Sequence, residues 1–179
     1  MPDNILPFRG VKPKISTTAF IAPNAMIIGD VEIGDGSSIW YNCLVRGDIN
    51  VIRIGKNSNI QDGTVIHVDR KKYGAFIGDN VTVGHMALIH ACTLESNSMV
   101  GMSATVMDGA VVESGALVAA GSLVAPGKII PSGQMWAGTP ARYVRDLKPS
   151  DKEMLADIWP GYRDLAGEYQ KNGLGTDLS

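Results

Sequence analysis

An aliphatic residue returns every six positions along most of this chain of 179 residues. A period of six fits neither an α-helix nor a plain alternating strand, and a fixed period over this length is typical of a solenoid. Each unit contributes a short strand and a tight corner, and the coils must stack because no unit can bury its apolar face alone. The twenty repeating positions are Ile15, Ile21, Ile27, Ile33, Ile39, Val45, Ile54, Ile60, Ile66, Ile77, Val83, Ile89, Leu94, Val100, Val106, Val112, Val118, Val124, Ile130 and Trp136.

The other positions of each unit support the same interpretation. Four residues after the aliphatic position the side chain is usually small or β-branched, as in Ala19, Ser37 and Thr64. Glycine and asparagine recur where a corner needs unusual backbone angles. We therefore predict an all-β solenoid. The pattern resembles that of the hexapeptide-repeat family, and this resemblance implies three units per coil, so that the twenty units make between six and seven coils.

The repeat leaves room for one domain, with short segments before and after it. We expect residues 1–14 to form a lead-in that covers the first coil and residues 15–142 to form the solenoid. Residues 143–172 are expected to form a helical segment on its outside. Ser150 and Glu153 resemble a capping box at the helix start, and Pro160 should kink or break the helix. The last residues, 173–179, are expected to fray.

The amino-acid composition excludes some classes of binding partner. The net charge of −2 offers no basic surface for nucleic acid or anionic lipid. The apolar stretch of residues 110–126 keeps the six-residue period, so we interpret it as solenoid core and expect no membrane span. The start of the chain lacks the features of a signal peptide. Cys43 and Cys92 make no disulfide framework, and a cytoplasmic location is predicted.

All three histidines of the chain lie between residues 67 and 90. His67 follows Ile66 and His90 follows Ile89, and these two aliphatic residues are three units apart. We therefore expect the two histidines to stack in neighbouring strands about 4.8 Å apart. Two imidazoles at that spacing can converge on one metal ion at about 2.0–2.1 Å each.

His85 is expected on a different face, where it cannot reach the same ion within one chain. A second molecule arranged about a three-fold axis would supply it, because closed cyclic symmetry terminates such heterologous contacts. We expect Val45 to stack with Ile60 on the face of His85. That assignment places Arg46, Asp48, Gln61 and Asp62 on the His85 face.

These residues carry a closer resemblance. The order Arg46-Gly47-Asp48, Asn59-Ile60-Gln61-Asp62-Gly63, His67, Gly84-His85 and His90 resembles that of the γ-class carbonic anhydrase family. The resemblance implies a left-handed parallel β-helix and a homotrimer. It also implies reversible hydration of carbon dioxide to bicarbonate, by hydroxide formed at a metal in the trimer interface.

The resemblance further implies a role for each matching residue. His67 and His90 of one subunit and His85 of its neighbour would bind zinc, with iron or cobalt as substitutes. Arg46 and Asp48 would form an intersubunit ion pair, and Gln61 would bond the metal water or substrate, supported by Asp62 and Asn59. Three neutral imidazoles leave one coordination position open, and the bound water then ionises near neutral pH.

The chain departs from the family pattern in its proton shuttle. Well-characterised members carry an acidic loop after the first histidine, whereas residues 68–74 are short and basic here. The position after Asp48, acidic in those members, is Ile49. Asp69 and Tyr162, the latter on the terminal helix, are candidates to assist proton transfer. Tyr162 is equally compatible with a packing role.

Three alternative functions share these features. Many hexapeptide-repeat proteins are acyltransferases, and the ending Trp136 to Arg142 is common to both groups. Acyltransferases typically use one histidine as general base, whereas this chain has three at metal-ligand spacing. A trimeric metal-binding scaffold without activity and a metal-dependent thioester hydrolase are the other two, since both would keep the same ligands.

Overall fold

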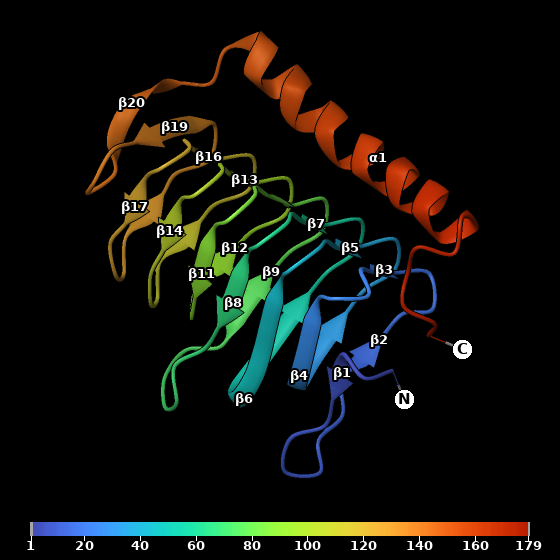
Figure 1. Ribbon diagram of the computed structural model, residues 1–179. Helices are drawn as coiled ribbons and strands as arrows, with labels where there is room; N and C mark the ends of the chain where they lie inside the picture. Colours follow the sequence, from blue (N-terminus) through green and yellow to red (C-terminus); the bar gives the residue numbers. More distant parts are fainter. Residues whose placement is uncertain (1, 179) are drawn as a thin grey trace.

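The computed structural model describes residues 2–178 and forms a parallel β-helix with a single α-helix along its outside (Figure 1). The predicted left-handed β-helix with a C-terminal helix is confirmed as the fold class. Among the described residues, no helix is long and apolar enough to cross a membrane.

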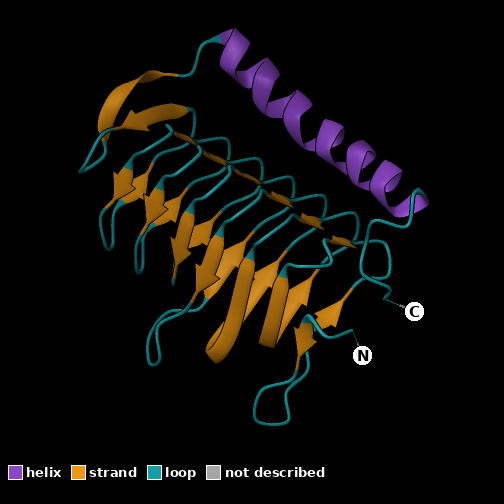
Figure 2. Cartoon of the chain, in the orientation of Figure 1, coloured by secondary structure: helices purple, strands orange, loops and turns teal. Residues whose placement is uncertain are grey.

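The coil is a triangular prism with three faces. The first face runs through β8, β11, β14 and β17, the second through β9, β12, β15 and β18, and the third through β3, β5, β7, β10, β13, β16 and β19. Strands β4 and β6 are long enough to pass around the corner between the first and second faces, as Figure 2 shows in orange.

The strand bounds are β1 (Ile5–Leu6), β2 (Lys14–Ile15), β3 (Phe20–Ile21), β4 (Met26–Ile33), β5 (Ser38–Ile39), β6 (Leu44–Ile54), β7 (Asn59–Ile60), β8 (Val65–His67), β9 (Ala75–Ile77), β10 (Thr82–Val83), β11 (Leu88–His90), β12 (Thr93–Leu94), β13 (Met99–Val100), β14 (Thr105–Val106), β15 (Val111–Val112), β16 (Leu117–Val118), β17 (Leu123–Val124), β18 (Ile129–Ile130), β19 (Gln134–Ala137) and β20 (Arg142–Asp146). The helix is α1 (Pro149–Lys171).

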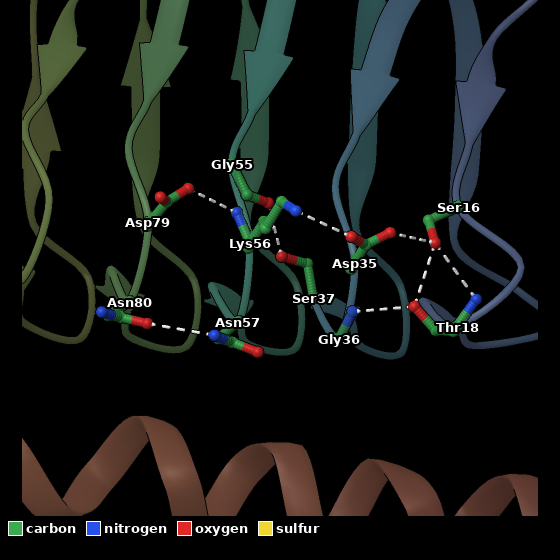
Figure 3. A network of polar contacts seen from close by, with 10 residues as sticks. All are labelled: Ser16, Thr18, Asp35, Gly36, Ser37, Gly55, Lys56, Asn57, Asp79 and Asn80. Atoms are coloured by element: carbon green, nitrogen blue, oxygen red, sulfur yellow. Dashed lines mark hydrogen bonds and ion pairs between the residues drawn. The ribbon is translucent and has the colours of Figure 1, made fainter.

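The repeating aliphatic positions form the core, as predicted. On the third face they pair in register from Ile21 through seven coils to Trp136. From Ile21 to Val124 nearly all are less than 5 % exposed. Asparagines with positive φ form a ladder along one corner, where the Asn57 side chain bonds that of Asn80 at 3.3 Å (Figure 3).

One assignment of a residue to a face was wrong. Val45 pairs with Ile66 on the first face, and Ile60 pairs with Ile39 and Val83 on the third. A full coil takes three units, so the chain returns to the face of Val45 only at Ile66. Arg46 and Asp48 consequently lie on the first face with His67 and His90, not on the face of His85.

The helix packs on the third face, against β3, β5 and β7. An aromatic cluster forms the contact: the ring of Trp40 lies 5.2 Å from that of Tyr169 and 5.5 Å from that of Tyr162. The helix thereby returns along the solenoid, so the two termini lie near the same end (Figure 1).

Two predictions about the helix were wrong. It begins at Pro149, and the carboxylate of Asp151, not a Ser150–Glu153 box, accepts the Lys148 N–H at 2.7 Å. Proline suits a first helical turn because its fixed φ is already helical. The helix also continues through Pro160. The carbonyl that Pro160 leaves without its usual partner belongs to the exposed Ala156, where water can solvate it.

The segment after the helix is docked, contrary to the prediction of fraying. Thr176 donates its N–H to the Ile21 carbonyl at 2.7 Å and accepts a bond from Asn4 at 2.9 Å. The tail therefore closes the first coil together with the lead-in, whose strand β1 pairs with β4 through Ile5 and Ile27.

Candidate metal centre

The two stacked histidines lie side by side on the first face. His67 ends β8 and His90 ends β11, and the two are register partners, as the period predicts. The Nδ1 atom of His67 lies 3.3 Å from Nε2 of His90. Two nitrogens that each lie about 2.05 Å from one tetrahedral zinc ion are about 3.3 Å apart, so this pair fits two positions of such a site.

Asp48 holds the other nitrogen of His67. Its Oδ1 lies 3.0 Å from Nε2 of His67, and its other oxygen accepts a bond from Arg46. Burial alone would raise the pKa of Asp48, but the hydrogen bonds from His67 and Arg46 outweigh it and bring the pKa below its ordinary value. Asp48 is therefore an ionised acceptor at neutral pH.

His90 has a carboxylate partner that the sequence analysis missed. Oδ1 of Asp108 lies 2.6 Å from Nδ1 of His90. Asp108 stands two residues after Val106, which pairs with Ile89 in the next coil. The signal was present in the repeat, because an acidic residue one coil beyond a candidate ligand, on the same face, lies within its reach.

His85 lies in the turn after β10 of the third face, two residues beyond Val83 and away from the other two histidines. Its Nδ1 is 2.9 Å from Oδ2 of Asp62. Among residues 2–178, no three His, Cys, Asp or Glu side chains gather to hold a metal ion.

Gln61 and Asn59 are buried beside His85 on the third face. Nε2 of Gln61 donates to Oδ1 of Asn59 at 3.1 Å, and Asn59 donates in turn to the Thr82 hydroxyl at 2.9 Å. Both side chains are less than 7 % exposed. A chain of bonds of this kind fixes the orientation of the Gln61 amide.

The two candidates for proton transfer have different surroundings. Burial, followed by the nearby charge of Asp62, raises the pKa of Tyr162, so its phenol is protonated at neutral pH. Asp69 accepts the backbone N–H groups of Lys72 and Lys71 at 2.8 and 2.9 Å, which lower its pKa. A group that exchanges protons at neutral pH needs a pKa near 7, so Asp69 suits the capping of its loop better.

Both cysteines lie in the hydrophobic core of the solenoid. They are unpaired and buried, and burial raises the pKa of Cys43 to about 12 and that of Cys92 further still. Neither thiol is ionised at neutral pH in the metal-free protein.

Comparisons with known proteins point to two related groups. The family model for the bacterial transferase hexapeptide (six repeats) matches residues 12–47. The chain is 46 % identical over 159 residues to gamma carbonic anhydrase 1, mitochondrial, of Arabidopsis thaliana, covering 86 % of this chain. The chain spans 58 % of that plant relative's length.

A second relative and a solved structure match over greater shares of their lengths. The probable carbonic anhydrase of Methanocaldococcus jannaschii is 50 % identical over 143 residues, which cover 80 % of this chain and 89 % of the relative. The crystal structure of a hexapeptide transferase family protein from Anaplasma phagocytophilum has a TM-score of 0.91 at 46 % identity. It covers 94 % of this chain and 99 % of the other.

Proposed function

Since this chain belongs to the γ-carbonic anhydrase family of hexapeptide-repeat proteins, we propose that it catalyses the reversible hydration of carbon dioxide to bicarbonate. The reaction takes place at metal sites shared between the subunits of a homotrimer. The observation that carries the proposal is the 3.3 Å separation of His67 Nδ1 and His90 Nε2, each with an aspartate on its second ring nitrogen.

Zinc is the proposed ion, with iron and cobalt as substitutes. His67 and His90 of one protomer and His85 of a neighbouring protomer would hold it. Held by these three neutral imidazoles, the ion would supply a hydroxide nucleophile at neutral pH.

The surface around His85 supports a contact between protomers. Met86, which follows His85 in the sequence, is 71 % exposed, and Met102, on the next coil, is 54 % exposed. Leu88, which precedes His90 in β11 on the other face, is 37 % exposed. Apolar side chains beside incomplete ligand sets favour burial against another copy, and a heterologous contact of this kind closes into a ring.

The remaining site residues have proposed roles in binding and orientation. The amide of Gln61, held by Asn59, would orient the attacking oxygen or the substrate, and Asp62 would hold His85. Arg46 and Asp48 bond within the isolated protomer. We propose that Arg46 also bonds across the subunit contact, since its side chain remains 38 % exposed. The hydroxyl of Tyr162 would donate a hydrogen bond during turnover, at a position near Asp62.

The two unpaired cysteines also agree with a reducing compartment, and we propose the cytoplasm as the location.

Carbon dioxide hydration by stopped-flow kinetics tests the proposal, on protein loaded with zinc, iron or cobalt and with His90→Ala as control. A rate that disappears in the variant is expected. No rate above the variant's, in protein that holds its ion, would overturn the proposed activity.

The same preparation separates the alternatives. The likeness to a hexapeptide transferase favours an acyltransferase as second candidate. Acetyl transfer from coenzyme A that survives in a His67→Ala/His90→Ala variant would establish it. A trimer that loses its ion and dissociates in chelator, but is inactive in every metal form, would be a scaffold. Thioester hydrolysis that requires the metal would indicate the hydrolase.

A further inference from the structure

A turn on the coil after that of His90 places the carboxylate of Asp108 beside the candidate metal centre. Strand β14 stacks on β11, so that the chain leaving Val106 passes over His90. The turn is held on both sides: Gly109 donates its N–H to the Ala91 carbonyl at 2.7 Å, and Gly127 donates to the Asp108 carbonyl at 2.8 Å. Asp108 therefore occupies a constrained backbone position one coil away from the imidazole.

The contact selects one form of the His90 ring. An ionised carboxylate only accepts hydrogen bonds, so Nδ1 of His90 must carry the proton that it donates to Asp108 at 2.6 Å. In the neutral ring, the lone pair is then on Nε2, the atom that faces His67 Nδ1. Ligand histidines in metal sites generally donate their second N–H in this way, which orients the ring.

The two candidate ligands on the first face are held from opposite directions along the solenoid axis. Asp48, one coil before His67, bonds Nε2 of His67. Asp108, one coil after His90, bonds Nδ1 of His90. The remaining nitrogens of the two rings turn toward each other between these carboxylates, so each aspartate sets the direction of one ring.

We propose that Asp108 is a positioning residue for His90: its carboxylate fixes the tautomer and orientation in which Nε2 of His90 binds the metal. This inference rests on the proposed function, since it assumes that His90 is a ligand. It adds a residue outside the motif segments that end at His90, because Asp108 lies one full coil further along the chain.

Zinc affinity measures the effect directly. Asp108→Ala should weaken zinc binding about ten- to a hundredfold, determined by competition with a chromogenic chelator. Asp108→Asn keeps an accepting oxygen without the charge and should fall between Asp108→Ala and wild type. Asp157→Ala, which removes an exposed aspartate of α1, is the matched control and should bind zinc as wild type does.

A spectroscopic readout separates positioning from a general loss of structure. The visible absorption spectrum of the cobalt form reports the ligand geometry, and it should change in Asp108→Ala but not in Asp157→Ala. Urea unfolding of the metal-free proteins should give equal midpoints for Asp108→Asn and wild type, which shows that the loss of affinity is local.

The outcomes distinguish this inference from the proposed function. Wild type that takes up neither zinc nor cobalt would remove the metal centre and both proposals with it. Wild type that binds zinc, with Asp108→Ala and Asp108→Asn equal to it in affinity and cobalt spectrum, would overturn the role of Asp108 alone.

Discussion

Nδ1 of His67 and Nε2 of His90 face each other at 3.3 Å because the two residues are register partners on adjacent coils. This relationship depends on the period: both residues follow a buried isoleucine, and Ile66 pairs with Ile89. One protomer thus offers two converging nitrogens on its first face, with His85 on the third.

If the ligands come from two protomers, two defective chains complement each other. Co-expression of a His85→Ala chain with a His67→Ala/His90→Ala chain should produce mixed trimers, each with one complete site. With random assembly, about a quarter of the sites are then complete. Zinc content and carbon dioxide hydration should reach about that fraction of wild type.

Each variant expressed alone is the control and should bind almost no zinc. Mixed trimers that contain no more zinc than the separate variants would contradict sharing of ligands between protomers.

Gly109 should tolerate substitution less well than Gly115, a corner glycine with nearly the same backbone conformation. Its φ is +67°, and a Cβ there would lie 2.8 Å from Cζ of Tyr73. Gly109→Ala should reduce the free energy of unfolding by about 1–2 kcal/mol for the backbone conformation and by about 1–3 kcal/mol more for the overlap with the ring. Urea denaturation of Gly109→Ala measures the sum of these two losses.

Gly115 is the matched control, since its φ is +68° and no atom lies within 4 Å of the position of its Cβ. Gly115→Ala should show the backbone cost alone. The extra loss in Gly109→Ala should disappear in a Tyr73→Ala background, and equal losses in the two alanine variants would contradict the role of Tyr73.

The start of α1 should contribute stability that depends on pH. Asp151 accepts bonds from Arg145 and from the Lys148 N–H, and these lower its pKa from 3.8 to about 2. A lowered pKa in the folded state stabilises the fold above the unfolded value, and this contribution disappears as the pH falls from about 4 to 2.

Asp151→Asn should therefore unfold at a lower urea concentration than wild type at pH 7, with the gap closing toward pH 2. Circular dichroism of the metal-free proteins measures the midpoints, and Asp157→Asn is the control. A gap that remains constant across this range would contradict the assignment to Asp151.

Tyr162 should have separable packing and hydroxyl roles. Tyr162→Phe keeps the ring against Trp40, 5.5 Å between centroids, so the free energy of unfolding should be unchanged. If the hydroxyl donates a bond during turnover, its loss should slow hydration about tenfold, or ~1.4 kcal/mol in the barrier. Tyr162→Ala should lower stability by about 3 kcal/mol. Full activity in Tyr162→Phe would assign Tyr162 to packing alone.

The six-residue period was sufficient to predict the solenoid, its inward residues and the pairing of His67 with His90. Every coil repeats the same geometry, so a residue's position within its unit determines whether it points inward and which neighbour it meets. The face of Val45 was predicted wrongly from the same period, and Arg46 and Asp48 were misplaced with it. Their position became clear from the pairing of Val45 with Ile66.

Local signals at the end of the chain were less reliable. From Ser150, Glu153 and Pro160 we predicted that the helix starts later and is interrupted. The helix is instead held by contacts with residues outside it, namely Arg145 and the aromatic rings of Phe20 and Trp40. Such contacts stabilise a helix more than the propensity of a single residue does. The same holds for the tail, which Ile21 and Asn4 hold against the first coil.

The sequence by itself determined the fold, the core and the pair of stacked histidines, because a strict repeat converts spacing into neighbourhood. Only the tertiary structure decided which aspartate bonds which imidazole. Asp48 and Asp108 lie 19 and 18 positions from their histidines. Those separations span a coil each, and the reach of a side chain across coils depends on how each corner turns. The repeat specifies that a corner exists but not the direction of the side chains that leave it.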